Sequence, residues 1–508
     1  MVINRISLLC TIIAFFSSTT LAPTPIEKKL FIIITSYNNA DWCIKNLESI
    51  FMQKNPDNTG FYENYTVVIV DDESFDGNAE YIERYIYACD QQHRVTLIKN
   101  KTRQRALANI YMAMQLCDDS NAIVFNIDGD DYLAHDQVFA LINEIYQQPK
   151  DVWITYGQFI NWPSNEMGYC QPVSDEVVEK QLFRKKWWKP GQLRTFYAWL
   201  FQQVHLKDLL FDGPYFQGKF FPANSDLAIY YPMMEQAGFH YQFIPDIIYI
   251  RNVATPLNDF KVNKEVQILG SKLIREKKTY PRLESACPDY FEQFKNKKTS
   301  ILLLSQNPES AQKFITSAQR LMLGVENIYL CYLQTELSDE FTILSAKDYP
   351  IIPIELHRET VREQLIAVLE ECSSEYLILA NDRSLIVGYI HCSEHILALE
   401  KAFAYGFYYN VSLQHTCSDA NGRIEPLPPL NHIKDTLYAW GFQYADAYDW
   451  RSYNTFNGAL YRTKDLLEQW QQLNANTLPS FIEQWQKFSI DLENVGLCCQ
   501  QPKINLVA

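Results

Sequence analysis

The first part of the chain alternates short apolar runs with segments whose apolar residues recur at helical spacing. Residues 29–35 (KLFIIIT) form a continuous apolar run, which is typical of a strand buried on both faces. Residues 41–52 place Trp42, Ile44, Leu47 and Ile50 at helical intervals, and residues 66–70 (TVVIV) predict the next strand. Such alternation predicts an α/β fold with a mostly parallel sheet. The pattern continues with helices over 79–89 and 106–117 and strands over 95–98 and 121–127.

Polar and acidic residues follow three of these strands directly. The carboxyl ends of parallel strands meet at one edge of a sheet, where ligands bind in open α/β folds. Carboxylates so close together repel one another unless a cation or hydrogen-bond donors compensate them, so a divalent-metal site is the leading interpretation. The alternative is that Asp128 begins a turn or caps the following helix. The residues at the strand ends are Thr35 to Asn38, Asp71 and Asp72, and Asp128, Gly129, Asp130 and Asp131.

A second αβ pattern begins near residue 299. Residues 300–304 (SILLL) predict a strand, 311–322 and 361–372 predict helices, and 375–379 predict a strand that runs into 380–384 (ANDRS). The order resembles the first pattern, but the acid cluster is almost gone. We therefore expect an internal duplication that gives two tandem Rossmann-like domains, with the boundary in the Lys- and Pro-containing stretch 277–298. The predicted domains are 28–285 and 298–508.

Composition and charge narrow the class of protein. The chain has 508 residues, of which 47% are apolar and 21% charged, which is typical of a globular protein with a sizeable core. The formal net charge of −15 argues against nucleic acid as a partner, because a polyanion would be repelled. The twelve cysteines show no zinc-site spacing, and reduced core cysteines are favoured over a disulfide framework.

The N-terminus resembles a secretory signal or an uncleaved membrane anchor. Arg5 is followed by an apolar stretch over 6–16 and by small polar residues over 17–20. The stretch is short for a spanning helix, which needs about 20 apolar residues. Residues 1–27 are therefore predicted to be a signal or anchor with its spacer. Association with a membrane or the secretory pathway follows as the expected location, with a membrane association facing the cytoplasm as the second choice.

Taken together, the motifs Thr35-Ser-Tyr-Asn, Val70-Asp-Asp-Glu-Ser and Asp128-Gly-Asp-Asp resemble the family 2 inverting glycosyltransferases of the GT-A fold. The resemblance covers roughly residues 28–265. Each motif alone arises often by chance, whereas three at consecutive strand ends are considerably more specific. The second domain then corresponds to a degenerate GT-A-like copy with an accessory, scaffolding or acceptor-binding role.

The resemblance implies a role for each of these positions toward a nucleotide-diphosphate sugar. Asp72 would accept a hydrogen bond from the base, and Thr35, Tyr37 and Asn38 would line the base and ribose pocket. Asp131, with Asp130 beside it, would hold Mn²⁺ or Mg²⁺ against the diphosphate, since hard cations prefer oxygen ligands. Asp128 or Asp130 would bind ribose or groups behind the metal.

Direct displacement at an anomeric carbon needs a general base for the acceptor hydroxyl. Asp226, within Pro222-Ala-Asn-Ser-Asp, is the candidate. Similar enzymes often carry Glu-Asp at this place, and here Ser225 stands where the Glu would be. The alternative role for Asp226 is a helix N-cap, which Asn224 and Ser225 could also supply.

Further candidates lie between the acid cluster and Asp226. Trp187 and Trp188 are predicted to bind the acceptor by covering a sugar face, or else to belong to the core. Arg194 is predicted to meet the diphosphate or the acceptor. The basic run Lys99, Lys101, Arg103 and Arg105 could approach phosphate, but a solvated helix start is the more common structure.

The leading hypothesis is a metal-dependent, inverting glycosyltransferase of the hexosyltransferase type. It would use a nucleotide-diphosphate sugar, most plausibly a UDP-sugar by the resemblance, and a hydroxyl of a glycan, lipid or protein as acceptor. The alternatives are a catalytically inactive glycan-binding or assembly protein, and a nucleotidyl transferase. The nucleotidyl transferase is disfavoured because the chain has no Gly-rich phosphate loop followed by Lys.

Overall fold

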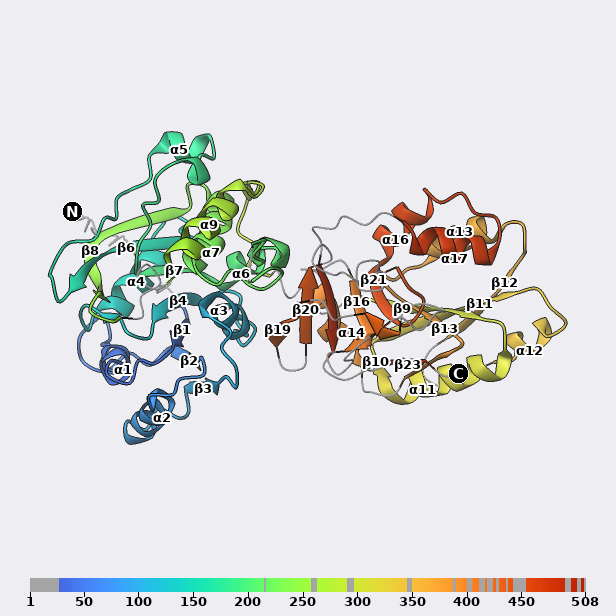
Figure 1. Cartoon of the computed structure of the whole chain (residues 1–508), viewed down its shortest axis with the longest axis horizontal. Coiled ribbons are helices and arrows are strands. Elements are labelled where there is room, and N and C mark those ends of the chain that lie inside the picture. The colour runs from blue at the N-terminus through green and yellow to red at the C-terminus, as the bar shows by residue number, and fades with distance from the viewer. Residues whose placement is uncertain are drawn as a thin grey trace, which may run out of the picture.

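The computed structural model contains two large β-sheets in separate halves of the molecule, each flanked by helices (Figure 1), and the described residues of the C-terminal half also form three two-stranded sheets. We call residues 27–289 the N-terminal unit and residues 297–506 the C-terminal unit. Residues 1–26 of the predicted signal or anchor lie outside the described residues, and no described helix is long and apolar enough to cross a bilayer. The described residues are 27–213, 216–256, 263–289, 297–344, 350–386, 390–399, 404–410, 416–417, 424–425, 429–434, 437–441, 454–488, 495–499 and 504–506.

The N-terminal sheet has the strand order β3-β2-β1-β4-β7-β6-β8-β5. The strands β3, β2, β1 and β4 are parallel, as are β6 and β8, whereas β7 is antiparallel to β4 and β6. The first strand is buried along its apolar run because helices cover both faces of the sheet. The strands are β1 (Leu30–Ser36), β2 (Tyr65–Asp71), β3 (Val95–Lys99), β4 (Ile123–Asp128), β5 (Tyr132–Leu133), β6 (Ile154–Trp162), β7 (Arg194–Tyr197) and β8 (Tyr241–Asn252).

The helices of this unit follow the apolar periodicity of the sequence. The first helix buries Cys43, Leu47, Ile50 and Phe51 on one side, which is the face that the spacing predicts. Short helices also occur where no long pattern exists. The helices are α1 (Cys43–Phe51), α2 (Asn78–Ala88), α3 (Ala106–Met114), α4 (Val138–Tyr146), α5 (Asp175–Glu179), α6 (Ala198–Gln202), α7 (Ser225–Ala237) and α9 (Lys264–Glu276).

The α/β class is confirmed, and the strands and helices predicted up to residue 128 are present within two or three residues of their expected ends. The mixed character of the sheet was not predicted. Its antiparallel strand β7 has only four residues, which is too short to show a period, and all four are buried.

The C-terminal sheet has the order β12-β11-β9-β13-β21-β16-β22-β20-β19. Alternate residues of β9 pack into different apolar clusters, Ile301 and Leu303 on one face and Leu302 and Leu304 on the other. The strands are β9 (Thr299–Ser305), β10 (Met322–Leu323), β11 (Val325–Leu333), β12 (Ile351–Leu356), β13 (Tyr376–Asn381), β14 (Ser384–Ile386), β15 (Ile390–His391), β16 (Ala404–Asn410), β17 (Thr416–Cys417), β18 (Ile424–Glu425), β19 (Asn431–Lys434), β20 (Leu437–Gly441), β21 (Ala459–Arg462), β22 (Val495–Cys499) and β23 (Ile504–Leu506). The helices are α11 (Pro308–Leu321), α12 (Ser338–Thr342), α13 (Val361–Glu371), α14 (Cys392–Leu399), α16 (Thr463–Trp470) and α17 (Leu478–Gln486).

The first seven strands of the two sheets share one topology. In the C-terminal sheet β12, β11, β9 and β13 are parallel, β21 is antiparallel to its neighbours, and β16 pairs with β22 in parallel. A side-chain contact also recurs. Ser49 of α1 accepts a hydrogen bond from Leu133 N at 3.1 Å, and Ser317 of α11 accepts one from Ile386 N at 3.1 Å. Each hydroxyl also donates to the carbonyl three residues earlier in its helix, at 2.7 Å.

Candidate active site

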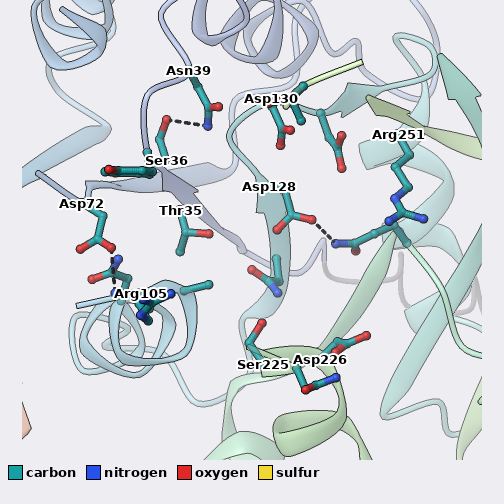
Figure 2. Close-up of a pocket in the computed structure, with 18 of the residues that line it drawn as sticks. Thr35, Ser36, Asn39, Asp72, Arg105, Asp128, Asp130, Ser225, Asp226 and Arg251 are labelled. Carbon is teal, nitrogen blue, oxygen red and sulfur yellow. Dashed lines mark hydrogen bonds between the residues drawn. The ribbon is translucent and has the colours of Figure 1, made fainter. Parts of the chain in front are cut away.

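The strand register brings the acidic strand ends to one edge of the N-terminal sheet. Thr35 of β1 is paired with Asp128 of β4, and Ser36 with Asp71 of β2, so Asp72 follows at the same level. A cavity of about 290 Å³ opens at this edge. Figure 2 shows Asp72 and Thr35 on one side of it, Asp128 and Asp130 across from them, and Asp226, in the first turn of helix α7, facing both.

Buried hydrogen bonds fix the turn that carries the acid cluster. Asn46 Nδ2 donates to Asp128 O at 3.0 Å and to Asp131 O at 2.7 Å. Asp131 Oδ1 accepts from Asn252 N at 2.6 Å. A Cβ on Gly129 would lie 2.6 Å from Ser36 Oγ and 2.9 Å from Ser36 Cα, so this position has room only for glycine. The turn is therefore held from helix α1, strand β1 and strand β8 at once.

Burial raises the pKa values of all three carboxyls in the cluster, and repulsion by their neighbours in the cluster adds to it for Asp130 and Asp131. Burial is the larger cause for Asp130, whose pKa rises to about 7, and the charge of Asp128 adds to it. The pKa of Asp131 is raised well above its usual range by burial and then by Asp130 and Asp128. Burial also raises the pKa of Asp128, although Arg194 opposes the shift. A cation at this place would offset the repulsion.

The donor set fits a hard divalent cation that is held only in part by the protein. The cluster offers oxygen atoms alone, which suits Mg²⁺ or Mn²⁺. Within the described residues, no group of three or more His, Cys, Asp or Glu side chains forms a ready coordination shell. One or two carboxylates, Asp131 and Asp130, would hold the ion, and a bound ligand and water would supply the remaining oxygens.

Asp72 is buried and already bound by protein donors. Its Oδ1 accepts from Asn100 Nδ2 at 2.9 Å and from Gln104 N at 2.7 Å, and its Oδ2 accepts from Arg105 N at 2.7 Å. The carboxylate thus also stabilises the chain just before α3. Because each carboxylate oxygen has two lone pairs, the described hydrogen bonds leave one acceptor position, on Oδ2, which the Arg103 Nε approaches to 4.0 Å.

The mouth of the cavity beside Asp72 is aromatic and cationic. The Arg103 guanidinium lies 3.5 Å from the centroid of the Tyr37 ring, and Phe75 meets the same ring edge-on at 6.3 Å. Arg103 and Arg105 both line the cavity, whereas Lys99 forms an exposed ion pair with Glu83. The basic run is therefore divided between the cavity and the solvent, and a wholly solvated helix start does not describe it.

A chain of polar contacts joins Asp226 to the acid cluster. Arg194 Nη1 lies 3.3 Å from Asp226 Oδ2, its Nε donates to Gln192 Oε1 at 3.4 Å, and Gln192 Nε2 donates to Asp128 Oδ2 at 3.1 Å. The Asp226 side chain is 33% exposed and the Arg194 side chain only 8%. Helix α7 begins at Ser225 with Asn224 as its N-cap, so Asp226 does not serve as the cap.

Several polar atoms around the cavity are buried and lack a hydrogen-bond partner among the described residues. They are Asn109 Nδ2, Asn126 Oδ1 and Asn224 Oδ1, and all three residues line the cavity. Buried polar atoms are seldom left without a partner in folded proteins. A ligand bound in the cavity could supply partners for these three atoms.

Most of the predicted residues line this cavity, and some do not. Thr35, Tyr37, Asp72, the three cluster acids, Arg194 and Asp226 all line it. Asn38 instead holds the neighbouring loop, because its Oδ1 accepts from Phe75 N at 3.0 Å. Trp187 and Trp188 line a separate hollow of about 250 Å³, whose lining includes Pro190, the residue before Gly191 of the main cavity.

The sequence analysis did not single out Asn126, Gln192 or Arg251, which also line the cavity. Asn126 is the one polar residue inside the apolar run 122–127, and this was a usable signal. Gln192 has no such signal, because its role depends on β7 lying antiparallel beside β4. Arg251 lies near the end of strand β8, which extends to Asn252.

Comparison with known proteins finds a family match over the first part of the N-terminal unit. The sequence model described as "Glycosyl transferase family 2" matches residues 31–210, which include the ends of β1, β2 and β4. Residues 31–210 form a glycosyl transferase family 2 domain. The match ends before Asp226 and leaves the C-terminal unit uncovered. No curated protein matches the chain.

Solved structures with some likeness to the family 2 domain are also transferases. S. aureus TarS (residues 1–349, with UDP-GlcNAc) has 13% identity and a TM-score of 0.32 over 45% of this chain and 59% of its own. The mannosyltransferase PcManGT from Pyrobaculum calidifontis (with GDP-Man and Mn²⁺) has 18% identity and a TM-score of 0.34 over 51% and 68%. GalNAc-T7 (with UDP, GalNAc and Mn²⁺) has 15% identity and 0.31 over 44% of each chain. The family assignment rests on the sequence match.

The C-terminal unit carries different residues at the places that correspond to the site of the family 2 domain. Asn381 pairs with Leu304 on β9 as Asp128 pairs with Thr35 on β1. Asn381 Nδ2 donates to Asn457 Oδ1 at 3.0 Å, in the position of the bond between Gln192 and Asp128. By the same register, Arg383 and Ser384 stand where the family 2 domain has Asp130 and Asp131, and Leu333 stands in place of Asp72.

Proposed function

We propose that this protein is a metal-dependent, inverting glycosyltransferase that transfers a sugar from a UDP-sugar to a hydroxyl of a glycan, lipid or protein acceptor. The observation that carries the proposal is that Asp226 lines the same cavity as Asp72 and the acid cluster, which lie within the segment that matches the glycosyl transferase family 2 model.

The hydrogen bonds of Asp72 support uridine as the nucleoside. Uracil presents a single ring N–H between two carbonyl oxygens, which matches a carboxylate with one free acceptor position. Guanine presents two adjacent N–H donors, and the second would face Oδ1, which Asn100 and Gln104 already occupy. The flat Tyr37 ring and the guanidinium of Arg103 lie at the same mouth and supply a stacking surface and donors for the base.

The acid cluster supports a metal-bound diphosphate. Asp131 and Asp130 would hold a divalent cation, which would act as a Lewis acid and neutralise charge on the departing diphosphate. Arg194 and Arg251 contribute positive charge beside the same carboxyls, since each lowers the pKa of Asp128. The cavity thus holds carboxylates and guanidinium groups beside one another. This combination favours a ligand whose phosphate groups also bind a metal ion.

Asp226 is placed to act as the general base. It lies in the first turn of helix α7 on the other side of the cavity, and it is partly exposed, so an acceptor hydroxyl can reach it. Attack by that hydroxyl on the face away from the leaving diphosphate inverts the anomeric configuration, and Asp226 takes the hydroxyl proton. The Arg194 guanidinium orients the carboxylate by holding its Oδ2.

The adjoining hollow with Trp187 and Trp188 is the proposed acceptor site. Trp187 is 79% exposed, and an exposed indole covers the apolar face of a sugar well. The C-terminal unit is proposed to be a degenerate copy without a donor site of its own. The shared strand order and the replacements at 333, 381, 383 and 384 support this role.

Transfer by variants of the full chain tests the proposal. The assay measures Mn²⁺-dependent UDP release from a mixture of UDP-glucose, UDP-galactose, UDP-GlcNAc and UDP-GalNAc, with added oligosaccharides as acceptors. We expect Asp226→Asn to lower the rate at least ~100-fold, in line with the usual contribution of a general base. Asp118→Asn, which changes an exposed carboxylate paired with Lys29, is the matched control. Full activity in Asp226→Asn would refute the assignment of the base.

A further inference from the structure

The two units meet through a buried asparagine. Asn431, the first residue of β19, is 3% exposed. Its Nδ2 donates to Gly218 O at 2.8 Å, and its Oδ1 accepts from Phe220 N at 3.2 Å. Lys219, between these two residues, donates to Leu430 O. The side-chain amide therefore binds the backbone of the N-terminal unit much as a neighbouring strand would.

Apolar packing surrounds these hydrogen bonds. Phe220 is 5% exposed, and its ring lies 5.3 Å from that of Tyr111 on α3. Ile433 on β19 is buried and belongs to the same hydrophobic cluster as Phe220 and Tyr111. β19 contacts α3, and Figure 1 shows the β19–β20 hairpin at the junction beside that helix. The junction is thus a dry contact in which an unpaired amide would be costly.

The loop that Asn431 holds leads directly into the candidate active site. We call residues 209–221 the junction loop; residues 214–215 lie outside its described part. It is closed by hydrogen bonds from Phe221 N to Leu209 O at 3.1 Å and from Phe211 N to Lys219 O at 2.8 Å. Pro222, Asn224, Ser225 and Asp226 follow it at once and line the cavity. The position of Asp226 therefore depends on how this loop is anchored.

The same loop also touches the nucleotide side of the cavity. The Arg105 guanidinium lies 4.7 Å from the centroid of the Phe216 ring in the junction loop. Arg105 lines the cavity, and its backbone N donates to Asp72. The junction loop consequently lies between Asn431 on one side and both the candidate base and the Asp72 region on the other.

We propose that Asn431 is a positioning residue through which the C-terminal unit sets the place of Asp226. The proposal rests on the proposed function, because it assigns a role toward that same site. The C-terminal unit is then a part of the active enzyme. It has no donor site of its own, but it supplies the β19–β20 hairpin, which holds the junction loop of the N-terminal unit in place.

The test compares Asn431→Ala with Asn454→Ala in the full chain. Asn454 is also buried in the C-terminal unit, where its Nδ2 donates to Trp485 O at 2.8 Å. We expect Asn431→Ala to lower Mn²⁺-dependent UDP release at saturating UDP-sugar by about 10- to 100-fold, since small misplacement of a reacting group has effects of this size. The Kd of UDP with Mn²⁺ should change less than threefold. Asn454→Ala should keep the wild-type rate of UDP release even if it lowers the Tm as much as Asn431→Ala does.

Hydrogen exchange gives a readout that does not need activity. Peptides covering residues 216–226 should exchange faster in Asn431→Ala than in the wild type, and should be unchanged in Asn454→Ala. A rate within twofold of the wild type in Asn431→Ala, an equal loss in Asn454→Ala, or unchanged exchange over 216–226 would each overturn the proposal. If the wild type releases no UDP from any donor, the proposed function has failed, and the exchange comparison alone then decides whether Asn431 anchors the loop.

Discussion

The hydrogen bonds of Asp72 predict how strongly the protein discriminates between nucleotides. Oδ1 accepts from Asn100 Nδ2 and Gln104 N, and Oδ2 accepts from Arg105 N, so one acceptor position remains for a base. Uracil needs one acceptor position for its single ring N–H. Guanine needs two for its two N–H donors, and a buried donor left without a partner costs about 1–3 kcal/mol. We therefore expect UDP to bind about 5- to 150-fold more tightly than GDP.

A single substitution tests this reasoning. Asn100→Ala removes one hydrogen bond from Oδ1 and frees an acceptor position there, so the ratio of the GDP and UDP dissociation constants should fall toward one. Gln104→Ala is the matched control, because Gln104 reaches Asp72 through its backbone N, while its side-chain amide donates to Thr102. Isothermal titration with Mn²⁺ measures both constants. Binding of GDP by the wild type as tightly as UDP, or an unchanged ratio in Asn100→Ala, would refute the reasoning.

Three other predictions concern stability and the metal site. Arg184→Met should destabilise the N-terminal unit by about 3–5 kcal/mol in chemical denaturation, because it leaves the fully buried Glu235 without its charged partner. In the wild type Arg184 Nε and Nη2 donate to the Glu235 carboxylate at 2.6 and 2.8 Å. A loss of stability below 1 kcal/mol would contradict this. The pKa of Asp130 is raised from 3.8 to about 7, so its contribution to the stability of the metal-free protein is present below pH 4 and lost as the pH rises through 7. The gain in Tm on adding Mn²⁺ should therefore be larger at pH 8 than at pH 6. A gain independent of pH would count against the cluster as the metal site. Gly129→Ala should abolish Mn²⁺-dependent UDP binding, because its Cβ would collide with Ser36 and displace the acid turn, and retention of wild-type affinity would show that the turn tolerates a side chain.

Much of the fold could be predicted because its strands are long and buried. The run that became β1 is apolar on both faces, and the acids that follow β2 and β4 mark strand ends by the abrupt change in polarity. Parallel pairing then places Thr35, Asp72 and Asp128 at one edge with no further information. Asp226 was found in a different way, from its resemblance to a motif position, and the structure places it in the same cavity.

The remaining parts of the site depend on contacts that local sequence does not encode. Gln192 reaches Asp128 only because the four-residue strand β7 inserts antiparallel beside β4. The hydrogen bonds to Asp72 come from the segment before α3, about thirty residues further along the chain. Asn431 contacts a loop more than two hundred residues away. The apolar periodicity of the sequence predicts none of these contacts, because the tertiary fold decides which of several equally polar residues meet.

The topology that the two units share indicates which of them carries the donor site. Both units keep the helix serine that caps the strand after the fourth parallel strand, through Ser49 and Ser317. The C-terminal unit lacks the carboxylates at 381 and 384 and has Arg383 where the other unit has Asp130. The scaffold contacts are thus repeated while the charges of the site are not, which agrees with one donor site per chain.

Calorimetric titration of the full chain with UDP tests the central claim most directly, since the claim is that separate loops form one metal-dependent nucleotide-sugar site. The account predicts binding heat with Mn²⁺, none in EDTA, loss of the heat in Asp131→Asn, and retention of it in Asp226→Asn. The absence of heat from the wild type with Mn²⁺, or equal affinity in Asp131→Asn, would contradict it.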